Sequence, residues 1–364
     1  MKFPGRLGLQ QRVLPSYRVP FFDQLAGACE GGMSLFAGQP RAKESILSGK
    51  LQIAGYAPAR NIHLFEGQLY FCYQRGLIDW LSDWNPDVLI VEANPRYLST
   101  PAALTWMQKR GRPVIGWGLG APPSNSPHFL RRWGERKWGA FLKRFDALIA
   151  YSQRGADEYA SYGIPREKNF VAHNAVSMAP KASPDHRPLT VDHATILFVG
   201  RLQARKRVDA LLHACASMPE PRPRLVIVGD GPERQNLEQV AKQVYPSVEF
   251  IGAKHGSELN PYFKEADLFV LPGTGGLAVQ EAMSHGLPVI VAKGDGTQDD
   301  LVRVENGWQI PPGDFDALVA TMREALSDVG RLRKMGEESY RIVSQEINLE
   351  KMVEVFVKAL NSVP

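Results

Sequence analysis

The sequence predicts an α/β fold with two doubly wound parallel-sheet domains. Short apolar runs without polar alternation recur along the chain, as expected for strands whose two faces are both covered by helices. Amphipathic helical patterns separate these runs, and such alternation of strand and helix produces parallel sheets. The length of 364 residues suggests about two domains. We expect their ligands in a cleft between the domains, beyond the carboxyl ends of the strands.

Apolar runs and helical patterns place the individual elements. In the first half the expected strands are Arg6–Gln11, Val88–Glu92, Val114–Trp117 and Ala147–Tyr151, and the expected helices are Pro20–Ala28 and Arg154–Tyr162. In the second half the expected strands are Thr195–Val199, Leu225–Val228, Leu268–Leu271 and Val289–Val291, and the expected helices are Val208–Ser217 and Glu233–Val244. Between the halves, Asn174–Thr190 contains three prolines and no periodicity, which is typical of a linker.

Composition excludes several classes of protein. With 44% hydrophobic and 22% charged residues, the chain has enough apolar surface to fold, so dominant disorder is excluded. The three cysteines, Cys29, Cys72 and Cys215, are far apart and form no CxxC pattern, which favours a reduced compartment. No apolar run approaches the roughly 18 residues of a membrane span. We therefore expect a cytoplasmic protein.

Charge is unevenly distributed along the chain. Residues 1–180 contain 22 Lys and Arg against 13 Asp and Glu, whereas residues 181–364 contain 21 against 25. A basic half favours phosphate-bearing partners, but no nucleic-acid-binding motif is present, so we expect no nucleic acid partner. The densest basic stretch, Pro127–Phe145 (127–145), combines Arg and Lys with Trp and Phe. It is either an interfacial helix on the inner face of a membrane or a domain helix whose charges are solvated.

A basic loop follows the first expected strand of the second half. Gly200 ends the strand, and Arg201 and Lys206 follow five residues apart. Glycine lets the backbone approach a ligand, and two cations beyond a strand end suit a diphosphate. A merely solvated basic loop is the alternative. After the next strand, Gly229 begins a Gly-Asp-Gly-Pro turn, in which Asp230 is more consistent with a structural role.

A glycine-rich loop and helix give the most specific local signal. Gly273, Gly275 and Gly276 follow the strand Leu268–Leu271, and a helix beginning near Leu277 can hold phosphate oxygens at its amino end. One turn into this helix, Glu281 can accept hydrogen bonds from ribose hydroxyls, or it is simply a surface residue. No GK[ST] follows the glycines, which disfavours nucleotide hydrolysis.

The order of motifs resembles family 4 glycosyltransferases of the GT-B fold. The second half contains GRLQARK, IVGDGPER, ADLFVLPG, GLAVQEAMSHGLPVIV, DGTQDDLV and NGWQIPPGD, and the first half contains the more loosely similar QQRVLPSYRVPFFDQLA and RFDALIAYSQRGADEYASYGIPREKNFVAHNAV. The resemblance implies sugar transfer from a nucleotide-sugar with retention of anomeric configuration and without a metal or other cofactor. It also implies an acceptor-binding domain over 1–178, joined by a crossing helix within 348–364, and a donor-binding domain over 188–347.

The same resemblance assigns roles to residues of the second half. Arg201 and Lys206 would hold the donor diphosphate as the catalytic cations, and Glu281 would bind the ribose. The remaining donor-binding residues would be Gly200, Gly229, Gly273, Thr274, Gly275, Gly276, Leu277 and Ala278.

Two positions depart from the family pattern. The first glutamate of the E-x7-E motif would fall at Gly273, and the histidine of a WGHG-like stretch is replaced by Leu119 in WGLG. Both positions concern the donor sugar, so an unusual sugar or a slow or inactive enzyme is implied. Thr274 is a candidate to replace part of the missing hydrogen bonding.

The first domain is expected to bind the acceptor. Arg12, Tyr17 and Arg18 follow its first strand, and Glu92 and Asn94 follow another; each of the latter two is equally consistent with a cap or loop role. The resulting interpretation is a hexosyltransferase that acts on a membrane-linked or glycan acceptor in envelope polysaccharide or glycolipid synthesis. The alternative is a weak or inactive nucleotide-sugar-binding protein with a regulatory role. The oligomeric state stays open.

Overall fold

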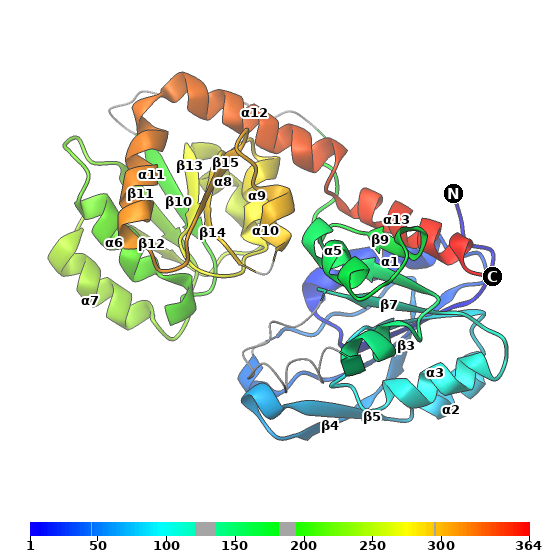
Figure 1. The fold of residues 1–364 in the computed structure, drawn as a ribbon. Helices are drawn as coiled ribbons and strands as arrows, with labels where there is room; N and C mark the ends of the chain where they lie inside the picture. Colours follow the sequence, from blue (N-terminus) through cyan, green and yellow to red (C-terminus); the bar gives the residue numbers. More distant parts are fainter. Residues whose placement is uncertain (45, 121–135, 182–193, 295) are drawn as a thin grey trace. The chain divides into compact units, whose positions relative to one another are not determined.

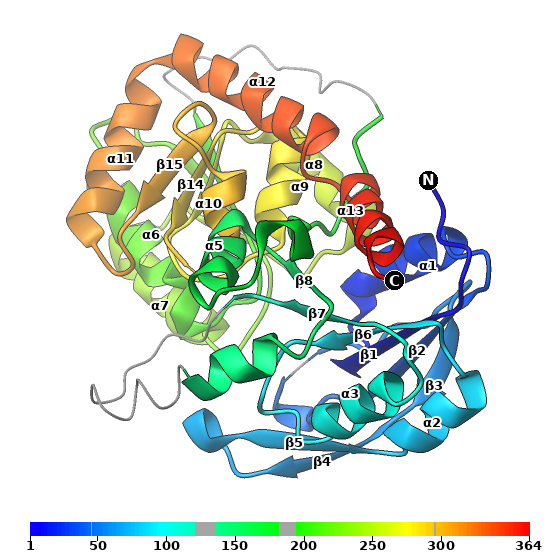
Figure 2. The same cartoon turned by 45° about the vertical axis from the view of Figure 1, so that its right-hand side comes forward.

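A computed structural model describes all residues except 45, 121–135, 182–193 and 295. The chain divides into two compact units: unit 1 comprises Met1–Val176 and Leu349–Pro364, and unit 2 comprises Ser177–Asn348. Each unit is built on a parallel sheet with helices on both faces (Figures 1 and 2). The predicted fold class, two doubly wound parallel-sheet domains, is confirmed. In the part of the chain described, no helix combines the length and the apolar character needed to cross a bilayer.

The main sheet of unit 1 has seven strands in the order β3-β2-β1-β6-β7-β8-β9. These are β1 (Leu7–Val13), β2 (Met33–Gly38), β3 (Gly55–Pro58), β6 (Val88–Glu92), β7 (Val114–Gly118), β8 (Ala147–Ala150) and β9 (Asn169–Val171). The helices of this unit include α1 (Val19–Gly27), α2 (Leu77–Trp84), α3 (Thr100–Gln108), α5 (Gln153–Ser161) and α13 (Leu349–Ser362). Because the chain leaves β1 for β2 and returns at β6, the order changes direction between β1 and β6.

Aromatic packing joins α13 to unit 1. The ring of Phe356 in α13 lies 4.9 Å from those of Phe21 in α1 and Trp117 in β7. All three side chains are almost fully buried. Asn361 also donates a hydrogen bond of 3.1 Å to the backbone oxygen of Lys2. The C-terminal helix is therefore part of the core of unit 1, although 172 residues of unit 2 separate it from the rest of that unit in the sequence.

A separate two-stranded antiparallel sheet, not among the expected elements, lies along one rim of unit 1 (Figure 1). It is a hairpin of β4 (Arg60–Leu64) and β5 (Phe71–Arg75). Cys72 and Gln74 of β5 are buried, whereas Tyr73 between them is exposed. This alternation shows that one face of the hairpin packs on the unit and the other faces outward.

The sheet of unit 2 has six strands in the order β12-β11-β10-β13-β14-β15. They are β10 (Thr195–Val199), β11 (Arg224–Val228), β12 (Glu249–Gly252), β13 (Leu268–Leu271), β14 (Val289–Ala292) and β15 (Gly307–Ile310). The helices of this unit include α6 (Val208–Ala216), α7 (Arg234–Val244), α8 (Asn260–Glu265), α9 (Ala278–Ser284), α10 (Thr297–Leu301), α11 (Phe315–Ser327) and α12 (Val329–Gln345).

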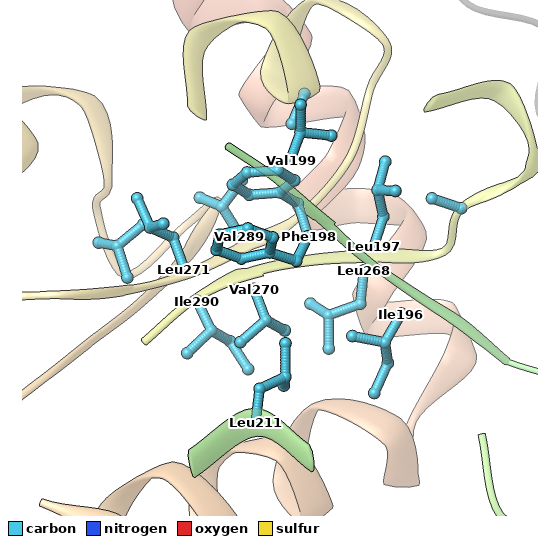
Figure 3. Close-up of a cluster of buried hydrophobic side chains, with 14 of the residues drawn as sticks. Ile196, Leu197, Phe198, Val199, Leu211, Leu268, Val270, Leu271, Val289 and Ile290 are labelled. Atoms are coloured by element: carbon cyan, nitrogen blue, oxygen red, sulfur yellow. The ribbon is translucent and has the colours of Figure 1, made fainter. Parts of the chain in front are cut away.

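The central strands of unit 2 are buried on both faces, which explains their unbroken apolar sequences. Figure 3 shows Phe198, Val270 and Ile290 from three adjacent strands, with Leu211 of α6 packed below them. All four are fully buried. Apart from the stretch 127–145, part of which lies outside the described residues, every strand and helix expected from the sequence occurs in the structure, with ends that differ by at most two residues.

Candidate functional site

Two loops of unit 2 meet where its strand order changes direction. Strand β10 lies between β11 and β13 and is parallel to both. The loop after β10 contains residues 200–207, and the loop after β13 contains residues 272–277. Because the strands are parallel, both loops lie at the same edge of the sheet. That edge is where doubly wound sheets bind their ligands.

Lys206 ties these two loops together. Its ammonium group donates hydrogen bonds to the backbone oxygen of Thr274, at 2.9 Å, and to that of Gly275. The residue is 5% exposed. Burial and the nearby charge of Arg205 lower the pKa of Lys206 to about 8. An ammonium group in this environment gains electrostatic stabilisation when an anion arrives.

Arg205, which was not predicted as a site residue, contacts the same glycine loop. Its Nη1 donates to the backbone oxygen of Thr274 at 3.1 Å, and the Thr274 amide donates back to the Arg205 carbonyl oxygen at 3.1 Å. The guanidinium is exposed. The basic run after Gly200 is the signal that could have identified it, because that run contains Arg205 between Arg201 and Lys206.

The structure gives a steric reason for glycine at position 273. A Cβ atom there would lie 2.1 Å from the Arg205 carbonyl oxygen and 2.5 Å from two backbone atoms of Lys206. Such contacts are far inside van der Waals distance. The basic turn therefore occupies the space in which a side chain at 273 would begin. A glutamate at position 273, as in the E-x7-E motif, would be in steric conflict with this close approach of the two backbones.

Arg201 and the glycine turns complete this edge of the sheet. Arg201 is exposed directly after β10. A Cβ at Gly229 would lie 1.9 Å from the oxygen of Gly200, so the turn after β11 needs glycine to pack beside the turn after β10. The side chain of Asp230 accepts a hydrogen bond of 2.7 Å from the amide of Gly231. This local bond agrees with the structural interpretation of Asp230.

Helix α9 begins at Ala278, directly after Gly276 and Leu277. Amides in the first turn of a helix have no partner inside the helix. Glu281 is half-buried in the first turn, and burial raises the pKa of its carboxyl. The donor-contacting residues expected from Gly273 to Glu281 thus lie on one continuous segment after β13.

A polar cluster occupies the corresponding point of unit 1, between β1 and β6. The guanidinium of Arg12 donates to both carboxylate oxygens of Glu44, at 2.9 and 3.0 Å, and the Arg12 amide donates to Glu92 at 2.7 Å. Burial raises the pKa of Glu92 to about 7. Although burial opposes it, hydrogen bonds from Arg12 and Arg41 lower the pKa of Glu44 to about 2. Glu44 was not predicted, because no motif marks the loop after β2 that carries it.

The acceptor candidates Tyr17 and Asn94 differ in their exposure to solvent and in their hydrogen bonding. Tyr17 is 45% exposed. Asn94 is half-buried, and its Oδ1 accepts a hydrogen bond of 3.0 Å from the amide of Arg96, as in a local turn. Tyr17 is therefore able to contact a ligand through its exposed surface, whereas Asn94 has at least a structural role.

The expectation for Arg18 is corrected. This residue is 7% exposed, and its guanidinium donates to the side chain of Asn174 and, at 3.3 Å, to the backbone oxygen of Ala175. It also lies over the rings of Trp117 and Tyr151. The guanidinium thus links the start of helix α1 to the segment after β9, and Arg18 does not face an acceptor.

The WGLG segment also divides into a buried and an exposed part. Trp117 is 1% exposed, whereas Leu119 is 51% exposed. The side chain at the position of the family histidine therefore lies at the surface of unit 1, where it presents only an apolar group.

The basic stretch 127–145 is described only from residue 136 onward. Trp138, Leu142 and Phe145 are buried in the core of unit 1, whereas Arg136 and Lys137 are exposed. This arrangement agrees with the domain-helix alternative over the described part, because its aromatic side chains are not available to insert into lipid.

Comparisons with known proteins agree with this architecture. Residues 183–342 match the family model for glycosyl transferases group 1, and residues 37–179 match that for glycosyltransferase family 4. A GDP-mannose-dependent alpha-mannosyltransferase of Mycobacterium tuberculosis is 31% identical over 65% of this chain and 63% of its own length. The sulfoquinovosyl transferase SQD2 of Arabidopsis thaliana is 32% identical over 40% of this chain and 30% of its own length. The chain thus spans less than two thirds of these two curated relatives.

Solved structures show the same fold over the whole chain. The lipopolysaccharide outer core galactosyltransferase WaaB superposes with a TM-score of 0.71 at 18% identity, covering 98% of this chain and 99% of its own. Anabaena Alr3699/HepE, solved in complex with UDP, superposes with a TM-score of 0.72 at 18% identity over both complete chains. The chain therefore has the GT-B fold, with a region that matches the family 4 model followed by a region that matches the group 1 model.

Proposed function

We propose that this protein is a retaining, metal-independent glycosyltransferase that transfers a hexosyl group from a nucleotide-sugar to a membrane-linked or glycan acceptor in envelope polysaccharide or glycolipid synthesis. One observation carries the proposal: Lys206, in the loop after β10, is anchored by hydrogen bonds to the glycine loop after β13. Support also comes from relatives named for mannosyl transfer and for lipopolysaccharide core biosynthesis, the latter from Rhizobium meliloti.

The proposed chemistry uses the cations to stabilise the leaving group. Arg201 and Lys206 hold the donor diphosphate, and Arg205 adds a third positive charge beside them. As the bond between the anomeric carbon and the diphosphate oxygen breaks, negative charge grows on the diphosphate. Fixed cations therefore stabilise the transition state more than the bound donor. This charge compensation requires no metal.

Retention follows from attack on the face that the nucleotide leaves. The acceptor hydroxyl forms the new bond to the anomeric carbon, and a donor phosphate oxygen accepts the hydroxyl proton. No protein side chain is then needed as a base, which is consistent with Gly273 and Leu119 at the two positions that depart from the family pattern. Gly200, Gly229 and the loop residues Gly273, Thr274, Gly275, Gly276, Leu277 and Ala278 approach the diphosphate in this proposal, and Glu281 accepts hydrogen bonds from the ribose.

The acceptor in this proposal binds at the β1/β6 edge of unit 1. Arg12, Glu92 and Tyr17 provide the contacts, with Asn94 shaping the adjoining turn. The enzyme would act in the cytoplasm on the inner face of the cell membrane, where membrane-linked acceptors of this kind are glycosylated.

The second candidate function is nucleotide-sugar binding with little or no turnover. The absence of side chains able to hydrogen-bond at Gly273 and Leu119 favours it. Incubation with a panel of UDP-, GDP- and dTDP-sugars and lipid-linked acceptors distinguishes the two. Binding of a donor with neither transfer nor hydrolysis would establish the second function.

The donor site itself is tested by calorimetric titration with UDP and GDP. We expect the Arg201→Ala, Lys206→Ala double variant to bind at least about tenfold more weakly, since two charge-assisted contacts are lost. The matched control is Lys242→Ala with Lys264→Ala. Both are exposed lysines of unit 2 on helices that lead into the opposite edge of the sheet. Equal affinity of both double variants would refute the assignment.

A further inference from the structure

The outward face of the β4–β5 hairpin is apolar. Ile62 and Leu64 of β4 are each 39% exposed, and Tyr73, which pairs with Ile62, is 44% exposed. At the tip, Phe65 and Leu69 are 70% and 69% exposed. We call these five residues the hairpin patch. Exposed apolar side chains are normal when they are scattered, but a contiguous group marks an interaction surface.

Positive charge borders the hairpin patch. Arg60 and Arg75 pair across the open end of the hairpin, and both are exposed. Glu66 adds one acidic residue at the tip. Unit 1 as a whole contains 24 Lys and Arg against 15 Asp and Glu, whereas unit 2 contains 19 against 23. An apolar patch with Tyr and Phe on a basic unit matches the surface of an anionic bilayer in both charge and polarity.

The inward face of the hairpin is fixed to the ligand edge of the sheet. Asn61 Nδ2 donates to the backbone oxygen of Arg12 at 2.8 Å, and Gln74 Nε2 donates to that of Gln11 at 3.0 Å. Gln74 also hydrogen-bonds the side chain of Gln10. These bonds hold the hairpin against the end of β1, so the hairpin patch has a fixed position relative to the Arg12 cluster.

We propose that the hairpin patch docks unit 1 onto anionic lipid. Phe65 and Leu69 enter the boundary between head groups and acyl chains, while Arg60 and Arg75 contact lipid phosphates. Docking at this place holds the β1/β6 edge at a fixed distance from the bilayer surface, since the hairpin is bonded to the end of β1. That consequence rests on the proposed function, because only a membrane-linked acceptor benefits from it. Binding to lipid does not depend on it.

Vesicle flotation tests this docking with the full chain. The vesicles contain phosphatidylcholine alone or with about 30% phosphatidylglycerol. The test variant is Phe65→Asn with Leu69→Ser, in which Asn suits the positive φ of 58° at position 65. The control is Val304→Ser with Phe315→Ser, since these residues of unit 2 are 80% and 39% exposed.

We expect the parent chain and the control to float with the anionic vesicles, and the hairpin variant to bind at least about tenfold more weakly. Arg60→Glu with Arg75→Glu is expected to abolish the preference for anionic over neutral vesicles. Undiminished flotation of the hairpin variant would overturn the proposal, as would flotation lost instead on substitution of Arg136 and Lys137 to Glu.

Two further measurements test for self-association of the chain and for the integrity of unit 2. Sedimentation velocity shows whether the hairpin patch joins two copies of the chain. A dimer that the Phe65, Leu69 variant dissociates, without vesicle binding, would overturn lipid docking. UDP and GDP titrations of the hairpin variant report that unit 2 is intact and should match the parent. If the parent chain binds no nucleotide, the proposed function alone is refuted. If the parent chain does not bind anionic vesicles, the docking alone is refuted.

Discussion

Replacing Gly273 by alanine is the most direct test of how the donor site is built. The added Cβ would lie 2.1 Å from the carbonyl oxygen of Arg205 and 2.5 Å from the Cα and C atoms of Lys206. Non-bonded carbon atoms normally stay about 3.5 Å apart. Since the obstructing atoms belong to the backbone, the turn that carries Lys206 must move by about 1 Å.

The loss of folding free energy follows from the contacts that this movement disturbs. Overpacking by one methyl group costs about 1–3 kcal/mol. If the turn instead moves away, the bonds that join Arg205 and Lys206 to Thr274 weaken, at about 1 kcal/mol each. Either route lowers the stability of unit 2 by about 1–3 kcal/mol, or its melting temperature by about 2–12 °C. The displaced ammonium also weakens UDP or GDP binding, by about tenfold.

Calorimetry and nucleotide titration measure both effects. Gly330→Ala is the matched control, since its Cβ would have Asp328 Oδ1 at 3.4 Å as its nearest neighbour. It lies in helix α12, where alanine is the better helix former, so unchanged or slightly higher stability is expected. Gly273→Glu should be at least as damaging as alanine, although it restores the family carboxylate.

A Gly273→Ala variant that melts and binds nucleotide like the parent chain would refute this steric role of Gly273. The steric role is also refuted if Gly273→Glu increases transfer activity, because the backbone approach would then leave room for the carboxylate. A loss of stability with unchanged nucleotide affinity would retain the steric account but remove Lys206 from the donor site.

Three other expectations follow from charges in the two units. Nucleotide diphosphate affinity should fall as pH rises through about 8, because the diphosphate binds the ammonium form of Lys206; titrations at about pH 7 and about pH 9 test this, and Lys206→Met should remove the step. Arg18→Met should lower the stability of unit 1 by about 1–3 kcal/mol, because Asn174 and Ala175 lose a buried donor. Thermal unfolding measures this loss, and an unchanged melting temperature would contradict it. Burial raises the pKa of Glu92 to about 7, so its contribution to stability is complete below its unfolded value near 4.5 and is lost as pH rises to about 7; Glu92→Gln should flatten the unfolding profile across that window, and an unchanged profile would show that another group titrates there.

The separation of an acidic and a basic unit gives these predictions independent readouts. Lys206 and Gly273 belong to unit 2, whereas Arg18, Glu92 and the hairpin patch belong to unit 1. A substitution in unit 1 should leave nucleotide diphosphate binding unchanged, since the proposed diphosphate contacts all lie in unit 2. For every variant of unit 1, nucleotide titration therefore shows whether unit 2 remains intact.

The sequence alone determined the fold class and the positions of most elements. Runs such as Thr195–Val199 and Leu268–Leu271 are apolar at every position or nearly so, and only a strand covered on both faces needs such a run. Glycine and proline punctuate the ends of these strands. Local signals of this kind depend on the residues of one segment. The structure contains the predicted strands because burial of the apolar run and the backbone preferences of the same residues both favour a strand there.

Tertiary structure decided which residues share a site. The strand order places Lys206 on carbonyl groups almost 70 residues away, and it shows that Gly273 is required by a neighbouring backbone. It also buried Arg18, whose sequence context resembles that of any exposed loop arginine. The apolar surface of the hairpin Arg60–Arg75 became recognisable only when the structure showed which of its side chains face outward. These outcomes depend on contacts between distant segments, and contacts of that kind leave no periodic mark in the sequence.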